Sequence, residues 1–198
     1  LEGTNLQGAV LDGCELEGTD LSTAKTDQRR NTPGREIADI VKGHALWLKS
    51  KGAEGERGDF IGMDLSTLDF CGVDLSVAVF SSAQLAGAKF VKAKLTMAKF
   101  SGADLSAANL TKADLRGINL SGANLDSANM RRADLGGLDL QDDKGKPTGK
   151  VWLSNLSSAN CTRVNFADAN LQGANIENTE FRKASLLRTN LIGCRVDA

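Results

Sequence analysis

The sequence predicts an all-β solenoid built from one repeated five-residue unit. Every fifth residue from Phe60 to Leu140 is large and apolar, which gives 17 consecutive positions without a slip. The residue two places earlier is Ala in 11 of these units, and the residue one place earlier is Asp or Asn in 12. Helices repeat at three and four residues and strands at two, so a strict period of five requires a corner after each unit.

The repeat divides one predicted domain, residues 1–198, into consecutive segments, each expected to contact only its neighbours along the coil. They are the first repeats (1–26), a helical insertion (27–58), the long block (59–140), a loop insertion (141–150) and the last repeats (151–198). Residues 141–150 are rich in turn-forming and charged residues, so we expect them to bulge from the coil. The period resumes after them, at Val151 or Leu156, with its phase moved by one residue.

Within residues 27–58 the apolar spacing becomes helical. One side of the predicted helix carries Ile37, Ile40, Val41, His44 and Leu48. Thr32 and Pro33 supply an N-cap and a first-turn proline, and Gly52 supplies a stop signal. We predict a helix from about residue 34 to about residue 50 that shields one edge or flank of the solenoid, because an exposed terminal coil invites pairing.

The unit Ala-Asp/Asn-Leu-x-x, as in Ala103-Asp104-Leu105-Ser106-Ala107 and Ala113-Asp114-Leu115-Arg116-Gly117, resembles the pentapeptide-repeat family. The resemblance implies a right-handed quadrilateral β-helix with four repeats per coil. The central Leu or Phe and the small residue two places before it would point inward, and Asp or Asn would suit the tight corners.

Four repeats per coil imply that residues 20 apart stack in interior columns. One column would hold Phe60, Phe80 and Phe100, and the opposite column Phe70 and Phe90. Past residue 100 the Phe positions change to Leu. In the small-residue column Ala78, Ala98, Ile118 and Leu138, size increases as its partners shrink, which is what a filled core requires.

Composition argues against several classes of function. The net charge of −1 gives no bulk attraction to nucleic acid or membrane, and no apolar run approaches the length of a membrane span. The single histidine, His44, lies on the apolar side of the predicted helix, and no metal-ligand spacing or phosphate-binding glycine loop is present. We therefore predict no enzyme activity, cofactor or metal.

The four cysteines do not suggest a disulfide framework. Three are expected to point inward and Cys71 outward; the inward ones are Cys14, Cys161 and Cys194. This pattern favours a reducing setting, which we take to be the bacterial cytoplasm. The chain begins at Leu1 already in repeat register, which favours a piece of a longer protein.

Basic residues form the first candidate partner surface. Lys92, Lys112 and Arg132 are 20 apart and should stack on one face, where like charges repel unless something answers them. Other basic residues lie near this ladder in the sequence, namely Lys89, Lys94, Lys99 and Arg131. They either bind an acidic partner or are solvated side chains answered by Asp on adjacent faces. An acidic belt of Asp59, Asp64, Asp69 and Asp74 is better explained by the repeat itself.

Apolar residues at outward positions form the second candidate surface. With Val151 as a repeat centre, Trp152 should point outward beside the loop insertion. Such a tryptophan either anchors an interface or covers the base of its own loop. Leu187 and Ile192 suggest a contact surface near the end of the chain.

We therefore predict a non-enzymatic scaffold that binds another protein. Two alternatives remain open: a DNA-mimicking gyrase- or topoisomerase-binding protein, and a targeting module of a bacterial effector. The charge of −1 and a chain that ends on repeats, without a C-terminal helix, count against the DNA mimic. The C-terminal coil is expected either to form a homodimer or to be blunted by Arg195 and Asp197.

Overall fold

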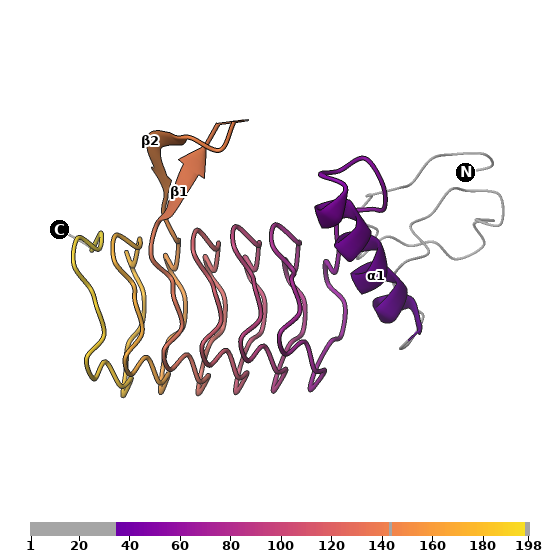
Figure 1. Ribbon diagram of the computed structural model, residues 1–198. Helices are drawn as coiled ribbons and strands as arrows, with labels where there is room; N and C mark the ends of the chain where they lie inside the picture. The colour runs from indigo at the N-terminus through magenta and orange to yellow at the C-terminus, as the bar shows by residue number, and fades with distance from the viewer. Residues whose placement is uncertain (1–34, 143, 197–198) are drawn as a thin grey trace, which may run out of the picture. The chain divides into compact units, whose positions relative to one another are not determined.

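The computed structural model describes residues 35–142 and 144–196 (Figure 1). The chain divides into two compact units, 1–36 and 37–198, and the described residues fall almost wholly within the second. The first repeats, Cys14 and the predicted Thr32–Pro33 cap lie outside the described residues.

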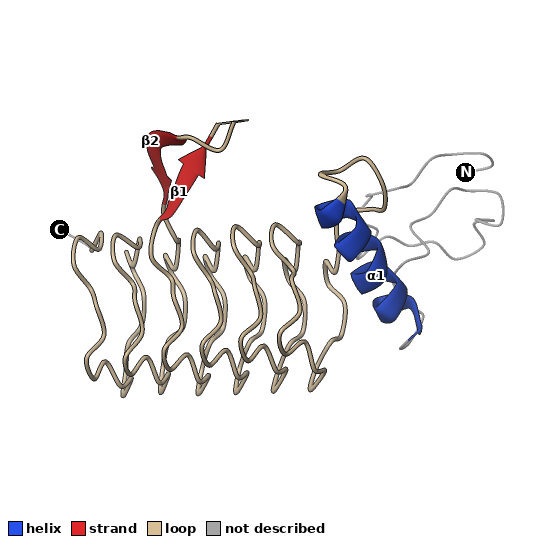
Figure 2. Ribbon diagram, viewed as in Figure 1, coloured by secondary structure: helices blue, strands red, loops and turns tan. Residues whose placement is uncertain are grey.

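The described part contains one helix, α1 (Arg35–Lys49), and two strands, β1 (Leu138–Gln141) and β2 (Pro147–Trp152). The helix confirms the prediction for residues 34 to 50. Elsewhere the chain pairs through isolated single-residue bridges, which is why the repeat block is drawn as loop in Figure 2.

The repeat block is a stack of turns joined by backbone hydrogen bonds. Parallel bridges join residues 20 apart, from Asp59 with Val79 to Asp114 with Asp134. Each unit also donates hydrogen bonds to the next turn; the Phe60 N–H, for example, lies 2.8 Å from the Val79 carbonyl. One turn therefore contains four five-residue units, as the resemblance implied, and successive turns lie side by side (Figure 1).

Two residues of each unit fill the interior. Outside the hairpin the central residues are buried from Phe60 to Leu171, and so are the small residues before them from Ala78 to Ala174, whereas Met63, Leu68 and Val73 in the first turn are half-buried. The Phe60 and Phe80 rings stack with centroids 4.5 Å apart, and the Phe70 and Phe90 rings at 5.1 Å, which confirms the predicted columns. Burying one such side chain contributes roughly 1.5–3 kcal/mol, so this core supplies most of the driving force for folding.

Asp and Asn shape the corners. Their Oδ1 accepts a hydrogen bond from the backbone N–H two residues later, at 3.0 Å from Asp64 to Ser66 and 3.1 Å from Asn109 to Thr111. The next residue commonly has a positive φ, 61° at Thr67 and 63° at Gly122. The acidic belt from Asp59 to Asp74 makes these same turn bonds, which supports its explanation by the repeat.

Helix α1 packs against the beginning of the core, as predicted. Ile37, Ile40 and Val41 contact the core, and His44 is fully buried. The His44 Nδ1 accepts a hydrogen bond from the Gly58 N–H at 3.0 Å, and its ring stacks on Trp47. A Cβ at Gly58 would lie 2.9 Å from the Phe60 ring, so only glycine permits this close approach. The single histidine thus has a structural role between helix and first turn.

The insertion in the repeat is longer than the predicted residues 141–150. Strands β1 and β2 form an antiparallel hairpin in which Leu138 pairs with Trp152 and Asp139 with Val151. Across the hairpin, bridges join residues 36 apart, such as Asn119 with Asn155, instead of 20. The hairpin therefore adds 16 residues, three units and one residue, which explains the change of phase.

Three apolar residues that match the period are consequently not repeat residues. Leu140 lies in β1, and Val151, predicted as a possible repeat centre, lies half exposed in β2. Leu138 does not continue the small-residue column; Ser154 does, fully buried, with its hydroxyl 3.3 Å from the Leu115 carbonyl. The strand period of two places apolar residues at 138 and 140, so their fit to the period of five is accidental.

The last turn is open on its outer side. Leu187, Ile192 and Val196 are 58%, 71% and 64% exposed. Arg195 forms an ion pair with Glu177 at 3.2 Å, while Asp197 lies outside the described residues. Cys161 is buried, Cys194 half-buried and Cys71 exposed, as predicted, and all three are free thiols.

The Gly122→Ala substitution tests the corner geometry. Gly122 has a φ of 63°, and a Cβ there would meet nothing within 4 Å. The cost of alanine is therefore purely conformational, and we expect the free energy of unfolding to fall by about 1–2 kcal/mol. Gly122→Asn is the control, because asparagine tolerates positive φ and should cost much less. Equal losses in both variants, measured by denaturant titration, would contradict the assignment.

Stability should depend on pH through His44. Burial lowers its pKa below 6.5; nearby Asp74 acts to raise that pKa, and Arg57 to lower it. The unfolded chain then takes up the proton first, so the stabilisation is complete above about pH 6.5 and declines as pH falls toward the folded pKa. The expected slope is at most about 1.4 kcal/mol per pH unit.

His44→Asn is the matched control, because its amide oxygen keeps an acceptor near the Nδ1 position and does not titrate. The difference in unfolding free energy between the two proteins, followed from about pH 7.5 to about pH 5.5, isolates this residue from the carboxylates. A constant difference across that range would show that His44 is not the sensing group.

Candidate functional site

The structure separates three of the predicted basic residues. Lys89 bridges Asp69 and Asn109, Lys94 bridges Asp74 and Asp114, and Lys99 bridges Val79 and Asn119. These are three different columns of the stack. Lys89 and Lys99 are ten residues apart, which is half a turn, so the three lysines do not share one face.

The ladder of Lys92, Lys112 and Arg132 does stack at one corner. The three residues have φ values of 58°, 59° and 59°, and each N–H donates to the following turn at 3.0 Å. Because the hairpin lengthens the next turn, the ladder continues with Asp168 and then Arg188. An acid therefore stands within the column of like charges.

Asp168 forms ion pairs with the arginines of this corner. Its Oδ1 accepts a hydrogen bond from Arg188 Nε at 2.6 Å, and its Oδ2 lies 3.6 Å from Arg131 Nε and 3.8 Å from Arg132 Nε. The hydrogen bond from Arg188 and the charges of the other arginines lower the pKa of Asp168. The carboxylate thus stays ionised and holds three guanidinium groups together.

Fewer of the lysines have an acidic ion-pair partner. Lys94 Nζ lies 3.6 Å from Asp74 Oδ2. Among the described residues, no ion pair involves the other four lysines of the predicted surface, which are Lys89, Lys92, Lys99 and Lys112. Asp168 and Asp74 therefore pair with some of these charges, and the binding of an acidic partner by the other four lysines stays a prediction.

Lysine also removes a turn bond. Where Lys89, Lys94 and Lys99 replace Asp or Asn, no side-chain oxygen accepts the N–H two residues later. That N–H, at Thr96 and Ser101 for example, has no acceptor within residues 35–142 and 144–196. A hydrogen bond of this kind contributes roughly 0.5–1.5 kcal/mol to stability. Lysine at these positions therefore makes the turn less stable than Asp or Asn would.

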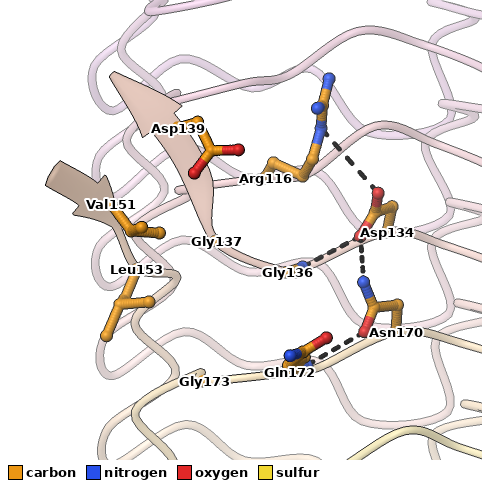
Figure 3. Close-up of a pocket in the computed structure, with 10 residues that line it drawn as sticks. All are labelled: Arg116, Asp134, Gly136, Gly137, Asp139, Val151, Leu153, Asn170, Gln172 and Gly173. Carbon is orange, nitrogen blue, oxygen red and sulfur yellow. Dashed lines mark hydrogen bonds and ion pairs between the residues drawn. The ribbon is translucent and has the colours of Figure 1, made fainter. Parts of the chain in front are cut away.

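A cavity of about 360 Å³ lies at the base of the hairpin (Figure 3). It combines an aliphatic wall, glycine backbone and polar side chains from two neighbouring turns. Its lining consists of Arg116, Asp134, Gly136, Gly137, Asp139, Val151, Leu153, Asn170, Gln172 and Gly173. None of the residues predicted to form a partner surface lines this cavity, although the Gly136–Gly137 pair before the hairpin was a signal that the backbone is closely approached there.

Glycines let the hairpin lie close to the turns. A Cβ at Gly137 would lie 2.3 Å from Val151 Cγ1, and one at Gly173 would lie 3.1 Å from Leu153 Cδ2. On the other side of the hairpin, Trp152 packs over Gly117, where a Cβ would lie 2.9 Å from its ring. Trp152 is nevertheless 51% exposed, so it both covers the hairpin base and presents a free ring surface.

The charges around the cavity are unequal. Arg116 donates two hydrogen bonds to Asp114, at 2.8 and 2.7 Å, and its Nε lies 3.8 Å from Asp134. Burial acts to raise the pKa of Asp114, but the hydrogen bonds from Arg116 outweigh it and hold that pKa below its usual value. Asp114 and the more distant Asp134 and Asp139 together raise the pKa of Arg116. One guanidinium thus faces three carboxylates.

Two of these carboxylates border the opening. Asp134 Oδ1 accepts hydrogen bonds from the Gly136 N–H at 3.0 Å and from Asn170 Nδ2 at 2.8 Å. The Asp139 carboxylate has no hydrogen bond or ion pair within the described part of the chain. Figure 3 shows the Arg116 side chain between Asp139 and Asp134, with Val151 and Leu153 on the side of Asp139.

No three His, Cys, Asp or Glu side chains in residues 35–142 and 144–196 are placed to hold a metal ion. Their one helix, α1, is too short and too polar to cross a membrane.

Known structures with similar sequences are pentapeptide-repeat proteins. One, from the thylakoid lumen of Arabidopsis thaliana, is 32% identical over 62% of this chain and 71% of its own, with a TM-score of 0.41. HetL of the cyanobacterium Nostoc, involved in heterocyst differentiation regulation, is 25% identical over 70% and 72%, with a TM-score of 0.29. QnrB1, a plasmid-mediated fluoroquinolone resistance protein, is 21% identical over 72% and 87%, with a TM-score of 0.44.

No curated protein matches the chain. The family model for pentapeptide repeats matches it in eight copies, over residues 1–25, 59–96, 98–137 and 159–196. The matched residues leave out the α1 region and the hairpin, and they make up more than half of the sequence. The chain therefore belongs to the pentapeptide-repeat family.

Proposed function

We propose that this protein is a non-enzymatic scaffold that binds another protein through the β1–β2 hairpin. One observation carries the proposal: three consecutive large apolar residues, Val151, Trp152 and Leu153, are 50%, 51% and 43% exposed. Tryptophan is enriched among the residues that dominate binding energy at protein interfaces. A hairpin that adds nothing to the core and exposes such side chains is suited to recognition.

The body that presents the hairpin supports this role. We propose that residues 59–196 form a right-handed quadrilateral β-helix, which is the fold of the known structures of the family. The 20-residue bridges and the buried columns support it. Each turn is bonded to both neighbours, so the hairpin stands on a rigid base, and little ordering entropy is lost there on binding.

The basic corner is a second candidate contact of the same scaffold. Lys92 and Lys112 project from successive turns without ion partners in the described residues, beside the partly answered Arg131 and Arg132. Such a corner favours an acidic surface on the partner.

Removal of the hairpin is the direct test. Deleting residues 137–152 joins Gly136 to Leu153 and restores the five-residue spacing from Leu135 to Leu156, so the variant should keep its repeat register. We expect it to retain its cooperative unfolding but to lose the proteins that wild type captures from an extract of the source cells. Trp152→Ala should weaken the same capture by at least tenfold, because buried interface tryptophans commonly contribute 2 kcal/mol or more.

Lys92→Ala with Lys112→Ala is the matched surface control. If the hairpin is the contact, this double variant keeps the captured proteins at near wild-type levels in low salt. Unchanged capture by the 137–152 deletion would refute the hairpin proposal, and loss only in the lysine variant would move the contact to the basic corner.

We propose the open last turn as a homodimer surface. Leu187 and Ile192 are exposed there, beside the backbone N–H groups of Leu186 and Leu191, which have no hydrogen-bond acceptor among the described residues.

Sedimentation tests this surface. Wild type should sediment as a concentration-dependent dimer, and the double variant Leu187→Asp with Ile192→Asp as a monomer, because burying unpaired carboxylates in the interface is costly. Ile61→Asp, at an exposed position in the first turn, is the control and should still dimerise. A wild-type monomer at all concentrations would exclude the dimer.

A further inference from the structure

We propose that the cavity beneath the hairpin binds the side chain of a lysine or arginine from an extended segment of the partner. The inference rests on the proposed scaffold function and names the chemistry that the hairpin recognises. It is carried by the shape of the cavity, its unequal charges and the free carboxylate of Asp139.

The shape fits a long side chain with a charged end. Val151 and Leu153 provide an aliphatic wall, and Gly136 and Gly137 add no side chains of their own, which lets Asn170 and Val151 lie close to their backbone. Lysine and arginine bury their methylene groups along apolar surface while the charged head remains near water. The partly open cavity offers both environments within about 360 Å³.

The charges select a cation. Arg116 is held by two hydrogen bonds from its side chain to Asp114, which neutralises that pair locally. Asp134, whose Oδ2 lies 3.8 Å from Arg116 Nε, and Asp139 still leave the single guanidinium outnumbered by carboxylates. An ammonium or guanidinium group of a ligand beside Asp139 would give that carboxylate the partner that it lacks among the described residues.

The same lining disfavours other side chains. A glutamate would add a further carboxylate near Asp134 and Asp139, and the one charge of Arg116 is already shared between Asp114 and Asp134. An uncharged chain of the same length would gain the aliphatic contact alone. Discrimination between these side chains is therefore the property to measure.

Peptide titration monitored by backbone amide NMR of the full chain tests the inference. The probes are acetyl-Ala-Xaa-Ala-amide peptides in which Xaa is arginine, lysine, norleucine or glutamate. We expect saturable shifts of the Gly136, Gly137 and Gly173 amides with arginine and lysine, with affinity at least about fivefold above that of norleucine. Asp139→Asn and Asp134→Asn should each weaken arginine-peptide binding roughly two- to fivefold, as exposed charge pairs do.

The Asp134→Asn variant should still fold, because asparagine makes the same turn bond elsewhere in the chain. Asn124 and Asn129 occupy the position of Asp134 in neighbouring units and make the same turn bond. Asp64→Asn, in a turn bond away from the cavity, is the control for loss of one negative charge and should leave binding unchanged. N-butylguanidinium alone is the small-molecule arm: affinity equal to that of the arginine peptide would replace the peptide segment by a free cationic ligand.

Equal shifts with norleucine or glutamate, or none with arginine, overturn the cation site. If these occur while the 137–152 deletion still abolishes partner capture, the hairpin scaffold stands and only its proposed chemistry fails. If arginine peptides bind as expected but the deletion leaves capture unchanged, the cavity is a cation site and the scaffold proposal fails.

Discussion

Hydrogen bonds from the backbone of one turn to the next are the interaction on which every other feature of this chain depends. They hold residues 20 apart in register, as with Asp59 and Val79, and thereby place equivalent positions of successive turns above one another. The buried columns, the corner ladder and the cavity all follow from that register. A residue at one position can consequently interact with its equivalent one turn away, and Asp168 with Arg188 is one result.

Much of the fold could be predicted because the period reports the interior directly. The small and large residues of the units between the first and last turns are buried as expected, and the helical spacing from Ile37 identified α1 to within a residue or two. The extent of the hairpin could not be read in the same way. Leu140 and Val151 match the period of five by chance, and antiparallel pairing of β1 with β2 overrides that match.

Only the part of the candidate site in which charged residues follow the repeat spacing could be predicted. The ladder from Lys92 to Arg132 followed from spacing alone, but its continuation through Asp168 depends on the 36-residue step that the hairpin creates. The cavity depends on that step as well, since it brings Asp134 beside Asn170 and folds Val151 back over Gly137. Interactions that cross an insertion of unknown length are not encoded in any local pattern of residues.

The hairpin returns to the corner of the stack where it begins, and this has a consequence for how the sequence of such a protein can evolve. The chain leaves the stack after Gly136 and re-enters it by Ser154, whose hydroxyl lies 3.4 Å from the Gly136 carbonyl. Any excursion that begins and ends at those neighbouring points leaves the turns on both sides in place. A loop of different sequence and length can therefore replace the hairpin at this junction while the stacked turns stay as they are.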